Sequence, residues 1–153
     1  MVIFYVYATE STRNVPIMKS KNLVQWTYCN TAFTNKTRPR FEPKAGIWAP
    51  DINYINNKYV LYYAMSVWGG EQTCGIGVAT ADSPQGPFTD HGKMFRSNEI
   101  GVQNSIDPSF LQYEGRNYLV WGSFRGIYVI ELTEDGLSLK PGAEKKENSR
   151  NSF

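Results

Sequence analysis

Two aspartates, Asp51 and Asp107, are the residues of this chain whose type and spacing best suit acid–base chemistry. Each stands beside a proline, in Ala49-Pro50-Asp51-Ile52 and in Ser105-Ile106-Asp107-Pro108, and the two lie 56 residues apart. Two carboxylates that converge on one pocket can cleave a glycosidic bond, because one donates a proton while the other activates water or attacks. An aspartate beside a proline can also be a turn or cap residue. The secondary-structure elements around the two aspartates therefore indicate whether they are catalytic residues or turn residues.

Those elements form a repeat. Three stretches are aromatic and β-branched, and each is followed by a stretch that alternates small or apolar with polar residues. Both patterns predict strands, and the Gly, Asn and Pro between them predict turns. No segment shows a helical period. The first members are 4–9, 58–66 and 117–123, and the second members are 15–20, 75–80 and 126–132.

The length of the repeat predicts a β-propeller. A unit of this length with about four strands matches one propeller blade, and propellers usually close with about four to eight blades. We therefore predict an all-β chain with about three blades, the first incomplete, over residues 1–142. Residues 143–153 are predicted to be a polar tail or the start of the next blade. Since the innermost strands of a propeller surround one axial channel, Asp51 and Asp107 are expected to face the same pocket.

The composition excludes several classes of partner and cofactor. Sixteen basic and 14 acidic side chains leave a net charge of +2, which gives no electrostatic reason to expect nucleic acid or an anionic membrane. No apolar run approaches the roughly 20 residues of a membrane span. One histidine, His91, and two distant cysteines, Cys29 and Cys74, form no zinc pattern, and we predict neither metal nor cofactor. The cysteines could pair or stay reduced.

Four segments resemble, in the correct order, the motifs of glycoside hydrolase family 43. The resemblance implies a five-bladed β-propeller that hydrolyses arabinan or xylan, or their oligosaccharides, with inversion, and it favours the arabinanase-type members. Such relatives are often exported, which favours an extracytoplasmic origin, although the compartment stays undecided. The four segments are Val15–Trp26, Gly46–Ile52, Asn104–Pro108 and Gly122–Gly126.

The resemblance also implies roles for single residues. Asp107 matches the aspartate that tunes the pKa of the general acid and orients it. The general base belongs on a segment before the first blade and the general acid on a fourth blade, so neither is expected within this chain. The chain alone is therefore expected to be inactive. The residues implied for sugar binding are Trp48, Asp51, Asn104, Ser123 and Phe124.

Other interpretations stay open at this stage. The chain could be a non-catalytic carbohydrate-binding propeller fragment, or it could belong to another five-bladed clan such as the fructan-cleaving enzymes, whose signatures are not visible. Asp51 could be a buried residue that organises a turn. Trp68 lies in a loop that could reach substrate, although a simple turn is the more common interpretation of such a sequence. Open blade edges also predict self-association.

Overall fold

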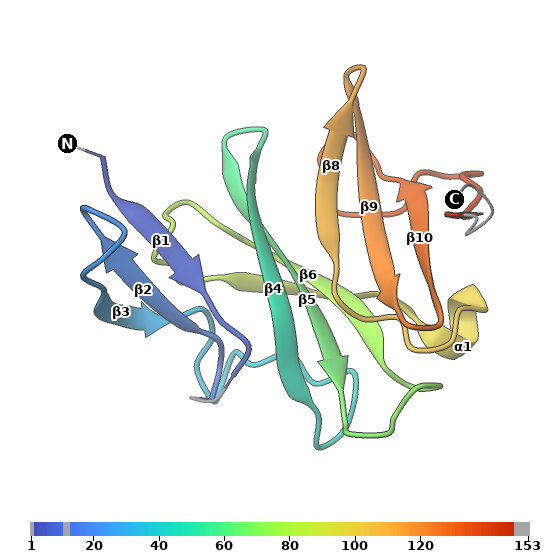
Figure 1. Cartoon of the computed structure of the whole chain (residues 1–153), viewed down its shortest axis with the longest axis horizontal. Coiled ribbons are helices and arrows are strands. Elements are labelled where there is room, and N and C mark those ends of the chain that lie inside the picture. Colours follow the sequence, from blue (N-terminus) through green and yellow to red (C-terminus); the bar gives the residue numbers. More distant parts are fainter. Residues whose placement is uncertain (1, 11–12, 149–153) are drawn as a thin grey trace.

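The computed structural model describes residues 2–10 and 13–148, and the chain forms three antiparallel sheets (Figure 1). The first sheet has the order β1-β2-β3, the second β4-β5-β6-β7 and the third β11-β10-β9-β8. One short helix, α1, follows β7. The bounds are β1 Phe4–Tyr7, β2 Pro16–Ser20, β3 Thr27–Thr31, β4 Gly46–Ile55, β5 Lys58–Ser66, β6 Gly75–Ala81, β7 Thr89–Arg96, α1 Ser97–Ile100, β8 Ser109–Tyr113, β9 Arg116–Ser123, β10 Gly126–Glu131 and β11 Lys146–Glu147.

The predicted repeat appears as equivalent hairpins in the second and third sheets. Asn56 and Asn57 join β4 to β5 with φ angles of 48° and 62°, and Glu114 and Gly115 join β8 to β9 with 49° and 72°. Two consecutive left-handed residues are typical of the tight turn whose twist matches that of the flanking strands. The chain therefore builds both hairpins with the same local geometry, 58 residues apart.

The strand that follows each hairpin is the buried centre of its sheet. In β5, seven consecutive residues from Val60 to Ser66 are buried, because the neighbouring sheets cover both of its faces. This explains why its sequence is continuously apolar rather than alternating. In contrast, β8 lies at the edge of its sheet and is largely exposed.

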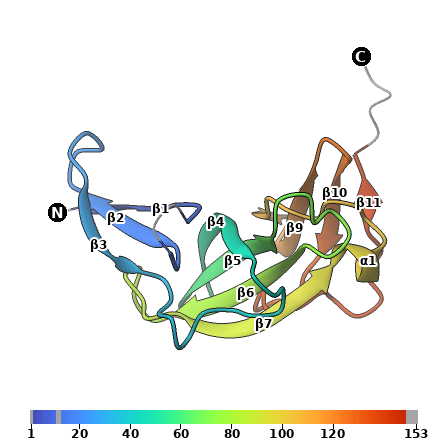
Figure 2. The same ribbon diagram turned by 90° about the horizontal axis from the view of Figure 1, so that it is seen from below.

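Two hydrophobic clusters fill the spaces between adjacent sheets. One joins the first and second sheets around Phe33 and Tyr63, and the other joins the second and third sheets around Tyr62 and Trp121. Figure 2 shows the result, an arc of three blade-like sheets with β4 between the first sheet and the third. The all-β, three-sheet prediction is thus confirmed.

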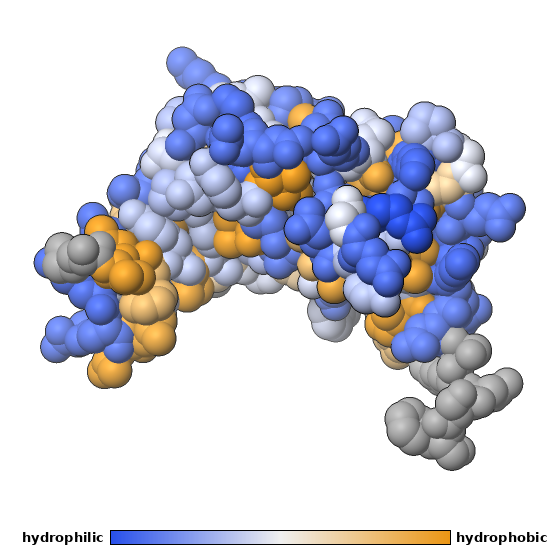
Figure 3. All heavy atoms as spheres, turned by 90° about the horizontal axis from the view of Figure 1, so that it is seen from above, coloured by the Kyte–Doolittle hydropathy of each residue, from blue (hydrophilic) through white to orange (hydrophobic). Residues whose placement is uncertain are grey.

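The two ends of the arc differ from its centre. Hydrophobic side chains gather on both arms of the arch in Figure 3. In β1 and just before it, the exposed hydrophobic residues are Val2, Ile3, Phe4 and Val6, whose exposed fractions are 37–67%. Within the described residues β1 pairs only with β2, so its other edge is open. Self-association through this edge stays a prediction.

The C-terminal segment contributes to the third sheet. Lys146 and Glu147 form β11 and pair with β10 as the outermost strand. Residues 149–153 lie outside the described part of the chain, and the division at residue 142 stays a prediction. No helix among the described residues is long and apolar enough to span a membrane.

Candidate active site

A cavity of about 490 Å³ lies between the second and third sheets, where β4 begins and β5 and β9 end. Five of the six residues predicted from the sequence line it together. They are Trp48, Asn104, Asp107, Ser123 and Phe124. Residues more than 70 positions apart thus meet in one place, as the blade repeat predicts.

A β-bulge shapes the first wall. The pairing of β4 with β5 shifts register between Trp48 and Asp51, and Ala49 within the bulge has a φ of 43°. An alanine in the left-handed region is strained, and here the hydroxyl of Thr9 accepts a hydrogen bond from its N–H at 2.9 Å. The bulge lets Trp48 line the cavity although Asp51 does not.

The segment before β8 forms the second wall. Asn104 and Asp107 both have left-handed backbones, with φ angles of 57° and 54°. The N–H of Asn104 donates to the carbonyl of Glu71 at 2.7 Å, and its side-chain amide donates to the hydroxyl of Ser123 at 2.9 Å. Asparagine and aspartate adopt this conformation more readily than most residues, and the contacts of Asn104 fix its position in the wall.

A glycine positions the third wall. Gly122 has a φ of 140°, and a Cβ on it would lie 2.1 Å from the carbonyl oxygen of Gly126. Only glycine allows β9 to approach the start of β10 this closely. The turn that follows places Ser123 and Phe124 at the cavity.

Three aromatic side chains line the cavity: Trp48, Trp68 and Phe124. The rings of Trp48 and Trp68 lie 6.3 Å apart at 57°, and the side chain of Trp68 is 96% exposed. Burying a ring of this size is favourable, so an exposed one beside a cavity offers a platform for an apolar ligand face such as that of a sugar. The guanidinium of Arg125 lies 4.9 Å from the centre of the Phe124 ring.

Among the described residues, Asp107 is the acid of the cavity whose carboxyl forms no ion pair. It is accessible to solvent, but partial burial raises its pKa above the usual range for aspartate. The other acid in the lining, Glu71, is occupied, because its carboxylate forms an ion pair with Arg125 at 3.0 Å and accepts a hydrogen bond from Gln103 at 2.7 Å. Asp107 is thus the carboxyl that a ligand in the cavity would meet.

Asp51 lies apart from this group. Its carboxylate accepts hydrogen bonds from the backbone N–H of Phe110 and the side chain of Asn53, both at 2.7 Å. The first of these bonds ties β4 to β8 across the boundary between two sheets. The arrangement favours the interpretation of Asp51 as an organiser of that boundary, and its role in sugar binding stays a prediction.

Trp68, Ser66 and Glu71 were not among the residues predicted for the site, although all three line the cavity. The signal for Trp68 was present, since a tryptophan before two glycines in a loop has no neighbours to bury it. Glu71 carried no such signal, because its place depends on the path of the loop between β5 and β6, and Ser66 looks like an ordinary residue at the end of β5.

No group of His, Cys, Asp and Glu side chains suited to a metal ion occurs among the described residues. Cys29 and Cys74 are not bonded to each other, and Cys74 is buried beside Ser97.

Comparison with known proteins identifies the family of this chain. The model of the glycosyl hydrolases family 43 matches residues 2–151. The chain belongs to this family. The five-bladed β-propeller predicted from the sequence is therefore its fold, of which the chain contributes three sheets.

The relatives that resemble this family 43 chain include proteins named as arabinanases and arabinosidases. An extracellular endo-alpha-(1->5)-L-arabinanase of Bacillus subtilis is 35% identical over 136 residues, which are 84% of this chain and 41% of the relative. An arabinan endo-1,5-alpha-L-arabinosidase C of Emericella nidulans is 39% identical over 69% of this chain and 33% of the relative.

Solved structures of the same kind share the fold. The alpha-L-arabinanase of Cellvibrio cellulosa superimposes with a TM-score of 0.81 at 28% identity, over 94% of this chain and 48% of that one. The native arabinanase of Bacillus subtilis gives 0.79 at 30% identity, over 92% and 51%. This chain thus spans about half the length of these structures and less of the curated relatives.

Proposed function

We propose that this chain forms one wall of an arabinan-binding active site, in which Asp107 faces the sugar and the aromatic residues hold it. The observation that carries the proposal is the cavity between the second and third sheets. It combines Asp107 with Trp48, Trp68 and Phe124, in a chain of family 43 whose relatives are named as arabinanases. A structure of the Cellvibrio cellulosa arabinanase with arabinohexaose superimposes with a TM-score of 0.81.

The chemistry assigned to Asp107 is electrostatic. An ionised Asp107 close to a second carboxyl would raise the pKa of that carboxyl, so that it keeps its proton near neutral pH and can donate it to the leaving oxygen. Asn104 and Ser123, already joined by a hydrogen bond, present polar groups for sugar hydroxyls. Trp68 supplies a ring face for stacking.

Hydrolysis with inversion needs two carboxyls on opposite sides of the bond, about 6.5–9.5 Å apart. Among the described residues, the cavity contains Asp107 and the ion-paired Glu71 as its only acids. We therefore expect the 153-residue chain to bind arabino-oligosaccharides without cleaving them. The same observation supports a second candidate function, a carbohydrate-binding propeller fragment that never becomes catalytic.

The test measures binding and hydrolysis together. Calorimetric titration with arabinohexaose and with xylohexaose would be compared with reducing-sugar release from linear arabinan, for the chain and for Asp107→Asn. Preferential binding of arabinohexaose supports the proposal, and binding of neither sugar, or only of the xylo-oligosaccharide, overturns it. Hydrolysis that Asp107→Asn abolishes would show that the chain supplies both proton-transfer groups, and would remove the binding-fragment alternative.

A further inference from the structure

A second cavity, of about 710 Å³, lies on the other side of the ends of β4 and β5, between the first and second sheets. The linings of the two cavities include consecutive residues of β5, Met65 and Ser66. Gly46 and Met65 line the second cavity, whereas Trp48 and Ser66 line the first. The proposed function makes no use of this second cavity.

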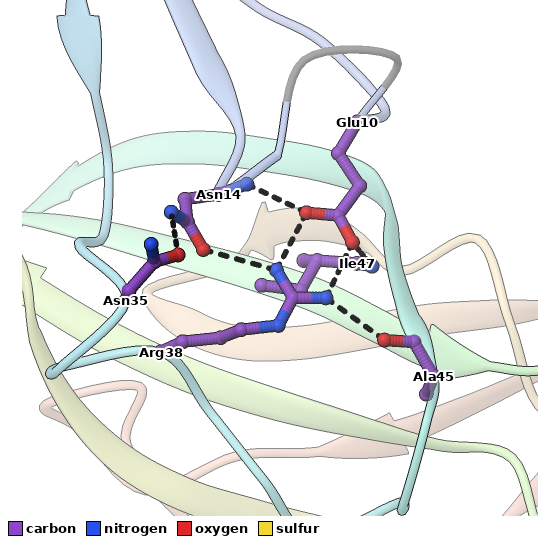
Figure 4. Close-up of polar contacts among 6 residues, drawn as sticks. All are labelled: Glu10, Asn14, Asn35, Arg38, Ala45 and Ile47. Atoms are coloured by element: carbon purple, nitrogen blue, oxygen red, sulfur yellow. Dashed lines mark hydrogen bonds and ion pairs between the residues drawn. The ribbon is translucent and has the colours of Figure 1, made fainter.

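The floor of the second cavity is a neutralised ion pair (Figure 4). Glu10 and Arg38, both buried, form an ion pair in which the guanidinium contacts both carboxylate oxygens. Arg38 also donates to the side chain of Asn14 at 3.1 Å and to the carbonyl of Ala45 at 2.8 Å. The charge of Arg38 is therefore neutralised by Glu10, and most of its N–H donors form hydrogen bonds within the protein.

The other acid of the lining is also occupied. The carboxylate of Glu42 lies 2.7 Å from the guanidinium of Arg96, and it accepts a hydrogen bond from Thr73 at 2.9 Å. Both carboxylates of the second cavity are thus paired with cations. Neither one neutralises a charge at the rim.

Three cationic side chains at the rim form no ion pair with a described carboxylate. Arg13, Arg40 and Lys44 line the cavity and are exposed, and none lies within ion-pair distance of a carboxylate among the described residues. The guanidinium of Arg40 donates to the carbonyl of Asn35 at 2.9 Å, which leaves its charge without a counter-ion among the described residues. The rim therefore carries three positive charges in a chain whose total is only +2.

The loop that carries two of these cations is held in place. Arg38, Pro39 and Arg40 are consecutive, so the buried Arg38 anchors the base of Arg40. Pro43 precedes Lys44, which has a left-handed backbone with a φ of 62°. A long side chain in this region of φ and ψ is strained and needs surrounding structure to hold it. The cations are thus presented on a restrained loop.

We propose that this second cavity binds the carboxylate of a uronic acid unit attached to the neutral sugar chain in the first cavity. The inference rests on the proposed function, because a polysaccharide is expected in the second cavity only if the first cavity binds one. A sugar carboxylate is planar and fits an arginine fork through two parallel hydrogen bonds, with lysine as an added point charge. A neutral pentose would leave the three charges without partners.

The test compares acidic with neutral sugars on the 153-residue chain. Trigalacturonate and its neutral counterpart galactotriose would be titrated at low and at high salt, with inorganic phosphate as a separate arm. We expect trigalacturonate to bind, galactotriose not to bind detectably, and added salt to weaken the binding. Arg40→Gln combined with Lys44→Gln should weaken trigalacturonate binding about tenfold, because two charge-assisted contacts are lost.

The matched control is Lys21→Gln combined with Arg116→Gln, which removes the same charge from residues outside the cavity. An equal loss in this control would overturn the proposal, because it would show attraction to net charge alone. Phosphate that binds as tightly as trigalacturonate, and displaces it, would also overturn it in favour of a general anion site.

Arabinohexaose separates this inference from the function on which it rests. If the chain binds arabinohexaose but not trigalacturonate, the proposed function stands and the uronate site is wrong. If it binds trigalacturonate through Arg40 and Lys44 but not arabinohexaose, the anionic site stands and the arabinan proposal fails.

Discussion

The two cavities share the ends of β4 and β5 but are held together by different forces. The basic cavity, between the first and second sheets, rests on the buried ion pair of Glu10 and Arg38. The aromatic cavity, between the second and third sheets, is held by backbone hydrogen bonds and by the partly exposed pair of Glu71 and Arg125.

This difference shows how the chain separates stability from binding. In the basic cavity the buried charges cancel, and the charges offered to a ligand are on the exposed rim. In the aromatic cavity two of the residues that would meet a ligand are exposed to solvent, namely Trp68, which is 96% exposed, and Asp107. Substitutions in the floor of the basic cavity should therefore change folding, whereas substitutions in the wall of the aromatic cavity should change binding.

The largest effect is expected for Glu10→Gln. Loss of one partner leaves Arg38 as an uncompensated buried charge, which costs about 3–5 kcal/mol of the free energy of unfolding. Urea denaturation followed by tryptophan fluorescence measures this change. Lys58→Met is the control, because its partner Asp82 is exposed and such pairs contribute about 1 kcal/mol or less. Equal losses in the two variants would contradict the contrast between buried and exposed pairs.

The same pair gives a pH dependence of stability. Burial acts to raise the pKa of Glu10, but hydrogen bonds from Arg38, Asn14 and Ile47 outweigh it and hold the pKa below its usual value of 4.5. Since the folded state binds the proton less tightly than the unfolded state, this contribution is complete above about pH 4.5 and is lost as pH falls toward the folded pKa. Unfolding curves between pH 7 and 3 should show a weaker acid dependence in Glu10→Gln than in the parent chain.

Asp51→Ala should have an intermediate effect, confined to the junction of the second and third sheets. It leaves the N–H of Phe110 without its partner, and loss of a hydrogen bond to a charged group costs about 1.5–3 kcal/mol. Hydrogen exchange should quicken at the Phe110 amide, while the Ile47 amide, which donates to Glu10, keeps its protection relative to the global stability. Unchanged exchange at Phe110 would remove Asp51 as an organiser of this junction.

Trp68→Ala should weaken binding of arabinohexaose about tenfold, which corresponds to about 1.4 kcal/mol, because a stacking platform is removed. Its midpoint of unfolding should not change, since the side chain makes little buried contact. Tyr113→Ala is the matched control, an exposed aromatic that does not line the cavity. Comparable losses of affinity in both variants would place the sugar elsewhere.

The smallest effect concerns the stability of Asp107→Asn. The folded state favours the protonated form of Asp107, because burial raises its pKa, so its ionisation at neutral pH opposes folding. The amide should raise the stability at pH 7 by less than about 1 kcal/mol, since the group is exposed to solvent. The gain should vanish as pH falls below the usual aspartate range. Asparagine tolerates the φ of 54°, so a loss of stability at pH 7 would show that the carboxylate makes a favourable contact.

Much of the aromatic cavity was predictable from local patterns. The repeat of aromatic strands and turns predicted the sheets, and five of the six predicted residues, which come from the Trp–Ala–Pro–Asp, Asp–Pro and Gly–Ser–Phe segments, line one cavity. These residues lie together because each blade is a local unit, so that equivalent positions in successive blades occupy equivalent places; their roles in sugar binding stay predictions. Asp51 is the exception, although it occupies the position in the second sheet that Asp107 occupies in the third. A β-bulge in β4 precedes it, and its carboxylate accepts a hydrogen bond from Phe110 instead of lining the cavity.

The basic cavity was not predictable in the same way. Glu10 and Arg38 are 28 residues apart, in segments that read as ordinary turns, and Arg13, Arg40 and Lys44 look like solvated surface charges. Which of these charges form ion pairs and which stay unpaired depends on distances between loops of different sheets. The periodicity of the sequence contains no information on those distances.

By itself, the sequence determined the all-β class, the blade repeat and the family, because strand and turn propensities act over a few residues and recur with each blade. Only the tertiary structure decided which side chains share a cavity. The reason is that the cavities form where one sheet packs against the next. The bulge at Ala49 shapes the aromatic cavity, and the buried pair of Glu10 and Arg38 forms the floor of the basic cavity.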